Sequence, residues 1–301
     1  MRGRILCVGR NSLDIVFGVD LAQLRPDSKQ RTSDPARLVG GQCVNAAVTL
    51  AGLGCAVFYA GVTGDDDGGR RVLAFLKERH VDCSTVETAK GMANPCAYIM
   101  VDRATGERGI VETAPEGFPR FSGNIADEIW NGISSIYFDG HEGDASVAIA
   151  AEAARRWVPT LTDAEVLTGG TQELLSRVGT AIVPRTLAAS LAGSDLPEDM
   201  LRALAELGGR VHVVTMGEEG AAGAVAGSDA IHLVPAFPCE AIDTTGAGDA
   251  FHAGFLFADL EGAPFPAAMK FAARVAAAAC EVRGASLGAE ALAALAAGFN
   301  R

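Results

Sequence analysis

The chain has 301 residues, of which 49% are hydrophobic and 21% charged, and its formal net charge is −12. This composition is typical of a globular protein with room for one large α/β domain, here expected to span residues 1–301. The negative charge disfavours nucleic acid and anionic membranes as partners, since both are polyanions, and favours a small metabolite. Seven scattered cysteines without a Cys-x-x-Cys pair, and the lack of a leader or membrane-span pattern, predict a cytoplasmic location.

The first predicted strand is the apolar run 4–8, which ends at Gly9. A short run of this kind suits a buried strand of a parallel sheet that opens onto a functional loop. Asp14 follows at the carboxyl side of the strand, where the residues alone also permit an ordinary turn. The loop lacks the Gly-x-Gly-x-x-Gly spacing of a dinucleotide site, which disfavours a Rossmann function.

Two adjacent glycines, Gly40 and Gly41, precede an Ala-rich helix that we expect over 44–53. Glycines at a helix start let backbone N–H groups face a ligand. Asn45 lies at the start of the helix, where its amide offers both a donor and an acceptor. Without further context, the same pattern also fits an ordinary N-terminal turn.

The next segments predict a strand at 56–60 and a helix at 69–79. The acidic run 65–67 between them is interpreted as a solvated helix cap rather than as a metal-binding loop. Segments 95–102 and 108–113 flank a turn-type sequence and predict a hairpin.

A further buried strand is expected at 133–138, and it ends at Asp139. A polar residue at the carboxyl end of such a strand is expected to face a cleft. His141, two residues later, is interpreted as a loop histidine. The alternation of helices and strands continues at 145–156, 158–162, 170–177 and 179–183.

The stretch 243–255 reads Asp-Thr-Thr-Gly-Ala-Gly-Asp-Ala-Phe-His-Ala-Gly-Phe and leads into a predicted helix. The first N–H groups of a helix lack intrahelical partners and carry the positive end of its dipole, so they favour a phosphate. Gly246 and Gly248 would let the backbone approach that phosphate. Asp249 would repel an anion, and we interpret it as the base that takes a proton from an attacking hydroxyl. The alternative is a plain strand-to-helix turn with an acidic first residue.

This stretch resembles the C-terminal signature of the ribokinase-like (PfkB) family of sugar and nucleoside kinases, Asp-Thr-x-Gly-Ala-Gly-Asp-x-Phe-x-x-Gly, and every specified position is met. The resemblance implies that Asp249 is the catalytic base and that the amides of Gly246, Ala247, Gly248 and Asp249 form an anion hole. It also implies an α/β fold with a mainly parallel sheet between helices. A small β lid is expected from segments at about 17–37 and 94–114.

The substrate side of the family pattern is also matched. Gly40, Gly41 and Asn45 resemble the family's first signature, Gly-Gly-x-x-x-Asn-x-Ala, in which glycine amides and the Asn hold sugar hydroxyls. Asp14 matches an early Asp that binds sugar hydroxyls in the family. Asp139 is assigned to the same substrate side.

The resemblance places ATP, with Mg²⁺, along a later segment. Thr215, Gly217 and Gly220 match the Thr-x-Gly-x-x-Gly segment that follows the nucleotide phosphates and ribose. The family's Asn-x-x-Glu motif, which organises magnesium, is missing from 183–190, and Arg185 stands at or near the vacated position. This departure resembles a branch nearer to ketohexokinase and sulfofructose kinase than to ribokinase.

Three further residues are implied as a site for a monovalent cation such as K⁺, beside the anion hole. They are Asp243, Thr245 and, through its carbonyl, Gly284 in the stretch 283–286.

The implied function is ATP-dependent phosphorylation of a sugar hydroxyl, and three alternatives stay open. A nucleoside kinase would stack a base on an aromatic residue, for which Tyr98 is the candidate in the lid. A sugar-phosphate kinase would use cationic lid residues such as Arg103 and Arg108. A sugar-sensing pseudokinase would explain the missing Asn-x-x-Glu, but the intact Asp249 argues against it. The apolar face of the lid permits a homodimer.

Overall fold

Short apolar runs form the central sheet. The computed structural model describes residues 2–32, 35–105, 108–284 and 286–299. The strands of the main sheet are β1 (Arg2–Val8), β4 (Cys55–Ala60), β6 (Val81–Asp82), β10 (Ser135–Phe138), β11 (Thr160–Asp163), β12 (Thr180–Pro184), β13 (Val211–Thr215), β14 (Ala221–Val225) and β15 (Ile231–Val234).

These strands lie in the order β15-β14-β13-β12-β11-β10-β1-β4-β6. The strands from β13 to β6 pair in parallel, whereas β14 and β15 add an antiparallel edge. A parallel sheet has helices on both faces, which explains why its strands are continuous apolar runs rather than alternating ones. The expected fold class, a mainly parallel sheet between helices, is confirmed.

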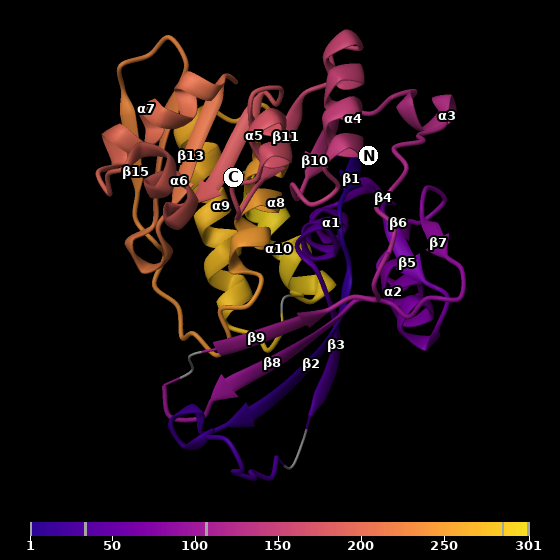
Figure 1. The fold of residues 1–301 in the computed structure, drawn as a ribbon. Coiled ribbons are helices and arrows are strands. Elements are labelled where there is room, and N and C mark those ends of the chain that lie inside the picture. The colour runs from indigo at the N-terminus through magenta and orange to yellow at the C-terminus, as the bar shows by residue number, and fades with distance from the viewer. Residues whose placement is uncertain (1, 33–34, 106–107, 285, 300–301) are drawn as a thin grey trace.

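Helices cover both faces of the sheet (Figure 1). One face carries α1 (Gln42–Gly52), α2 (Asp67–Glu78), α8 (Ala247–Leu260), α9 (Phe265–Cys280) and α10 (Ala289–Phe299), which share one hydrophobic core. The other face carries α3 (Asp127–Trp130), α4 (Asp144–Arg155), α5 (Gly169–Leu175), α6 (Arg185–Ala192) and α7 (Pro197–Leu207), which share a second core.

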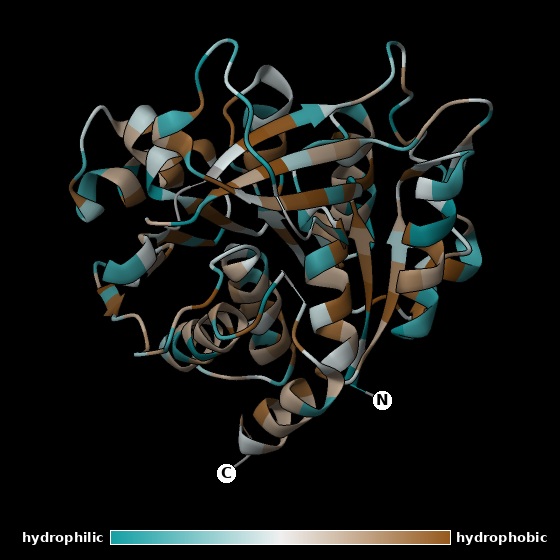
Figure 2. Cartoon of the chain, turned by 90° about the horizontal axis from the view of Figure 1, so that it is seen from below, coloured by the Kyte–Doolittle hydropathy of each residue, from teal (hydrophilic) through white to brown (hydrophobic). Residues whose placement is uncertain are grey.

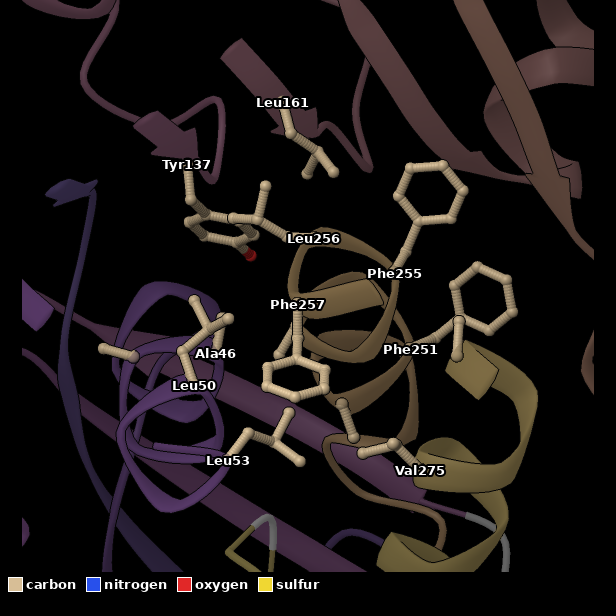
Figure 3. Close-up of a cluster of buried hydrophobic side chains, with 14 of the residues drawn as sticks. Ala46, Leu50, Leu53, Tyr137, Leu161, Phe251, Phe255, Leu256, Phe257 and Val275 are labelled. Atoms are coloured by element: carbon tan, nitrogen blue, oxygen red, sulfur yellow. The ribbon is translucent and has the colours of Figure 1, made fainter. Parts of the chain in front are cut away.

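The contact between α1 and α8 fixes the position of the site. Side chains of Leu50 from α1 and of Leu53, just after its last residue, face Phe257 from α8 in the core close-up (Figure 3). All three are buried, with exposed fractions of 1% or less. Complete burial of side chains of this size contributes about 1.5–3 kcal/mol for each side chain, so the two helices are held in a fixed relation to each other.

A smaller sheet forms a lid beside the body of the molecule. It consists of β3 (Ala36–Gly40), β2 (Ser12–Val19), β8 (Cys96–Asp102) and β9 (Arg108–Thr113), in that order. The predicted hairpin is confirmed as β8 and β9, although residues 106–107 of its turn lie outside the described residues. The other two lid strands overlap the expected segment 17–37 only at its ends, since β2 starts at Ser12 and β3 runs on to Gly40.

The outer face of the lid is partly apolar. Figure 2, which looks at the lid side of the molecule, shows hydrophobic residues along the lid strands. Tyr98 and Val111 are paired across β8 and β9 and therefore lie on the same face of the lid. They are 41% and 51% exposed.

No helix in the described part of the chain is long and apolar enough to span a membrane. The acidic run 65–67 acts as the cap that was predicted, because the Asp66 side chain accepts a hydrogen bond from the Gly69 amide at 3.0 Å.

Candidate active site

A cavity of about 2090 Å³ lies between the lid and the body. It is lined by lid strands, by the first turns of α1 and α8, and by loops that follow strands of the main sheet. This is the carboxyl end of the parallel strands, where open α/β sheets bind their ligands. The residues expected to be functional that line it are Asp14, Gly41, Asn45, Asp243, Thr245, Gly246, Gly248, Asp249 and Gly284.

The first turn of α8 carries the proposed base. Gly246 is the N-cap and has a left-handed backbone (φ 74°), which glycine adopts without strain. The helix then begins at Ala247, so Asp249 lies in its first turn. A Cβ on Gly248 would meet no atom within 4 Å, so the space beside this peptide is open. The turn therefore presents its amides and one carboxylate at the cavity.

Asp249 and Asn45 are 204 residues apart in sequence but in direct contact. The Asn45 side-chain amide donates to Asp249 Oδ2 at 2.7 Å, and both residues are buried. Burial raises the pKa of Asp249 well above its usual value, and the nearby Asp163 raises it further. The hydrogen bond from Asn45 and the nearby His252 lower this pKa. The carboxyl is therefore a stronger base than an exposed aspartate.

Asp14 reaches the cavity from the lid, because it is part of β2 and not of the loop after β1. Ser12 Oγ donates to Asp14 Oδ1 at 2.5 Å. A Cβ on Gly40 would lie 2.0 Å from Asp14 Oδ2, so only glycine leaves room for this carboxylate. Gly40 thus acts by placing Asp14 and does not line the cavity itself. Gly41 has φ 100° and packs against the backbone of Asn11.

Asp139 is placed differently from the prediction. Its carboxylate accepts from the backbone amides of Arg10 at 2.6 Å and His141 at 2.9 Å. It is 1% exposed and is not among the residues that line the cavity. Burial raises its pKa to about 6. Asp139 therefore holds two loops together, and the expectation that it faces the cleft is corrected, because both carboxylate oxygens point to backbone amides.

The three residues expected at a cation site lie together. Asp243 Oδ1 accepts from the backbone and the hydroxyl of Thr245, at 2.9 and 2.6 Å. Asp243 Oδ2 accepts from the Gly284 amide at 3.0 Å. These bonds tie the loop before α8 to the segment after α9. Ala285, in the same predicted stretch, lies outside the described residues.

The segment expected at the nucleotide forms the turn between β13 and β14. Thr215 ends β13, and Gly217 and Gly220 have φ of 60° and 92°, values that favour glycine. None of the three lines the cavity. Arg185, the first residue of α6, forms a two-pronged ion pair with Glu219 of this turn, at 2.6 and 2.7 Å.

The structure brings further polar residues to the site that the sequence did not indicate. Asn11 and Glu165 line the cavity, and Glu165 raises the pKa of Asp249. His141 also lines it, and its Nε2 lies 2.7 Å from Gln42 Oε1. Of these residues, Glu165 had a signal in the sequence, because it lies two residues after the end of strand β11.

Comparison with known proteins agrees with this geometry. The sequence model of the pfkB family carbohydrate kinases matches residues 3–292. The chain is 29% identical over 276 residues to ribokinase of Bacillus subtilis (strain 168), covering 91% of this chain and 92% of that protein. It is 25% identical over 291 residues to ketohexokinase of Mus musculus, covering 93% and 97%. These identities are too close to separate a ribokinase branch from a ketohexokinase branch.

A solved structure of Arabidopsis thaliana ribokinase, in complex with ribose and ATP, matches with a TM-score of 0.82. The two chains are 22% identical, and the match covers 98% of this chain and 99% of that chain. At this identity the match shows the shared fold.

Proposed function

The chain belongs to the pfkB family of carbohydrate kinases, and we propose that it phosphorylates a sugar hydroxyl with Asp249 as general base and the first turn of α8 as anion hole. Kinases of this family transfer phosphate from ATP. The finer assignment concerns which residues hold the sugar, accept its proton and stabilise the charge on the phosphoryl group as it passes to the sugar hydroxyl.

Two buried amide oxygens beside the cavity carry the proposal. Asn11 Oδ1 and Asn45 Oδ1 are buried and have no hydrogen-bond partner in the described part of the chain. Their amide nitrogens are used within the protein, by Tyr59 and Val62 for Asn11 and by Asp249 for Asn45. Buried acceptors of this kind are costly unless a ligand donates to them. Sugar hydroxyls are donors that fit both positions.

In the proposed mechanism Asp14 and Asn45 orient the sugar, and Asp249 accepts the proton of the attacking hydroxyl. The hydroxyl oxygen bonds to the γ-phosphorus as the bond to the ADP oxygen breaks. Gly246, Ala247 and Gly248 supply backbone amides to the charge that develops on the transferred group. Much of the rate then comes from positioning by groups that are held rigidly before the substrates bind.

ATP is proposed to lie along the turn that contains Thr215, Gly217 and Gly220. Magnesium is proposed to accompany it, because kinases use this ion to neutralise phosphate charge. Within the described residues, no group of three or more His, Cys, Asp and Glu side chains could hold a metal ion. The proton transfer is assigned to Asp249, whose carboxylate lies in the first turn of α8 and lines the cavity.

A second candidate, a kinase for an anionic sugar, is favoured by one observation. Arg10, Arg103 and Arg120 all line the cavity, and guanidinium groups bind phosphate and carboxylate well. The aromatic residue expected for a nucleoside kinase, Tyr98, lies outside this cavity, but Phe17 and Phe118 line it, so the nucleoside-kinase alternative stays open. The partly apolar outer face of the lid, with Tyr98 and Val111, supports a proposed homodimer, which light scattering would test.

A panel of ketoses, aldoses, nucleosides and sugar phosphates, assayed for ADP release, tests the function. A neutral sugar is expected as the best acceptor, and preference for a sugar phosphate would favour the second candidate. Calorimetry with the same panel identifies the pseudokinase alternative. That alternative would be supported by sugar binding without ADP release from any acceptor.

A further inference from the structure

His252 is a buried histidine on α8, three residues after Asp249, and is 2% exposed. Each of its ring nitrogens faces a backbone carbonyl. Nδ1 lies 2.6 Å from the oxygen of Gly248, and Nε2 lies 3.0 Å from the oxygen of Ile182. A carbonyl oxygen can only accept a hydrogen bond, and a neutral imidazole has one N–H. Both bonds therefore exist at the same time only if the ring carries two protons and a positive charge.

A buried cation needs a balancing anion. Asp163, at the end of β11, provides one, since its Oδ1 lies 3.3 Å from His252 Nε2. The hydroxyl of Tyr137 donates to the other oxygen of Asp163 at 3.0 Å, which holds this carboxylate in place. Asp163 is itself buried, at 2% exposed, and this burial raises its pKa well above the usual value, whereas the Tyr137 hydrogen bond lowers it. The ring and the carboxylate are thus arranged as an ion pair behind the anion hole.

Several other groups act on the charge of the ring. Burial lowers the pKa of His252 below its usual value and outweighs the carbonyls of Gly248 and Ile182 and the carboxylates of Asp249 and Glu165, which raise it. The aromatic rings of Tyr137 and Phe251 meet the imidazole edge-on. The two short carbonyl contacts argue in the opposite direction, for a charged ring, because a neutral ring would turn a lone pair toward one of the oxygens.

The Gly248 carbonyl and the Asp249 amide belong to the same peptide group. A charged donor on the carbonyl polarises that group and makes its N–H a stronger donor. The Asp249 N–H lies in the first turn of α8, where amides have no intrahelical acceptor. We propose that His252 is a positioning residue, held as an imidazolium by Asp163, that fixes and polarises the Gly248–Asp249 peptide of the anion hole. This proposal rests on the proposed function of α8.

The charge of the ring is tested first, on the unmodified protein and without substrate. A long-range ¹H–¹⁵N correlation spectrum reports the protonation of both ring nitrogens, and the spectrum of His252→Gln assigns the signal. His252 is expected to be doubly protonated at neutral pH, and Asp163→Asn is expected to make it neutral. His212 is the internal control, because it is equally buried but only its Nε2 faces a carbonyl, that of Gly208 at 2.7 Å. A neutral His252 ring in the unmodified protein overturns the proposal.

Kinetics then test the effect on the anion hole. His252→Gln is expected to lower kcat by about 10- to 10²-fold, the loss for one charge-assisted hydrogen bond, with KM for sugar and ATP changed little. His212→Gln should leave kcat unchanged. An unchanged kcat in folded His252→Gln overturns the polarising role. Failure of the proposed function is distinguishable, since it would appear as an unmodified protein without kinase activity, whatever the charge of the ring.

Discussion

Replacing Gly40 by alanine tests whether the lid positions Asp14 for the sugar. The new Cβ would lie 2.0 Å from Asp14 Oδ2, whereas real Cβ contacts are essentially never closer than 3.0 Å. The carboxylate must therefore withdraw by about 1 Å, because Gly40 is part of β3 and its backbone is paired with β2. A misplacement of this size in a substrate-positioning group costs about 10²-fold in rate. We expect kcat/KM for the sugar to fall by that factor.

The assay is ADP release with the best acceptor, at varied sugar and varied ATP. KM for ATP should stay unchanged, since Asp14 is placed on the sugar side. Crowding of the lid should also cost about 1–3 kcal/mol of stability, so thermal unfolding is measured in parallel. Gly109→Ala is the matched control, because it adds the same methyl group to the same sheet at 3.4 Å from Met100 Cε, an ordinary contact.

A double-mutant cycle separates the sugar contact from a general disturbance of the lid. If Gly40→Ala acts through Asp14, it should have little further effect on kcat/KM in an Asp14→Ala background. Full additivity of the two changes, or a folded Gly40→Ala enzyme with unaltered kcat/KM for sugar, would refute this account of Gly40.

Four other predictions concern the base and the ions. Asp249→Asn should lower kcat by about 10²- to 10⁴-fold while sugar and ATP still bind by calorimetry, and near-normal kcat would remove Asp249 as base. The same variant should be more stable than the unmodified protein at alkaline pH but not at acid pH. The pKa of Asp249 is raised by folding, so its ionisation costs stability as pH rises through that pKa, and asparagine removes this cost. Thermal melts across pH check the sign, and equal curves would contradict it. Potassium should raise activity through Asp243 and Thr245, and equal rates in a bulky organic cation at matched ionic strength would exclude this. Activity should need more free Mg²⁺ than the amount that saturates ATP, and Arg185→Ala should increase this requirement. Magnesium titrations of activity that overlap for the variant and the unmodified protein would contradict this role of Arg185.

Residues within the signature stretches could be predicted because each has a local physical reason. Gly246 needs a left-handed backbone, and Asp249 needs the first turn of a helix, so sequence spacing fixes both. Gly41 and Asn45 follow the same logic at the start of α1. The fold class was implied by the resemblance to the family, and continuous apolar runs such as β10 agree with it.

Long-range side-chain contacts could not be predicted in this way. Asp139 follows a strand, as a cleft residue would, but its partners are two backbone amides that the sequence does not mark. The unpartnered Asn11 Oδ1 depends on where Tyr59 and Val62 lie in space. Helix α7 carries a local signal that the sequence does show, Pro197 at its first position.

In the segment that departs from the family pattern, sequence and structure together define the surroundings of Arg185. The missing Asn-x-x-Glu left Arg185 as a possible source of positive charge for ATP, yet the structure pairs its guanidinium with Glu219. Exposed pairs of this kind contribute little to stability, and a phosphate oxygen is as good a partner for a guanidinium as a carboxylate. Glu219 lies in the turn that contains Gly217 and Gly220, so the pair also links α6 to the proposed nucleotide segment. Arg185 is therefore already held beside that segment, and ATP would only need to exchange one anionic partner for another.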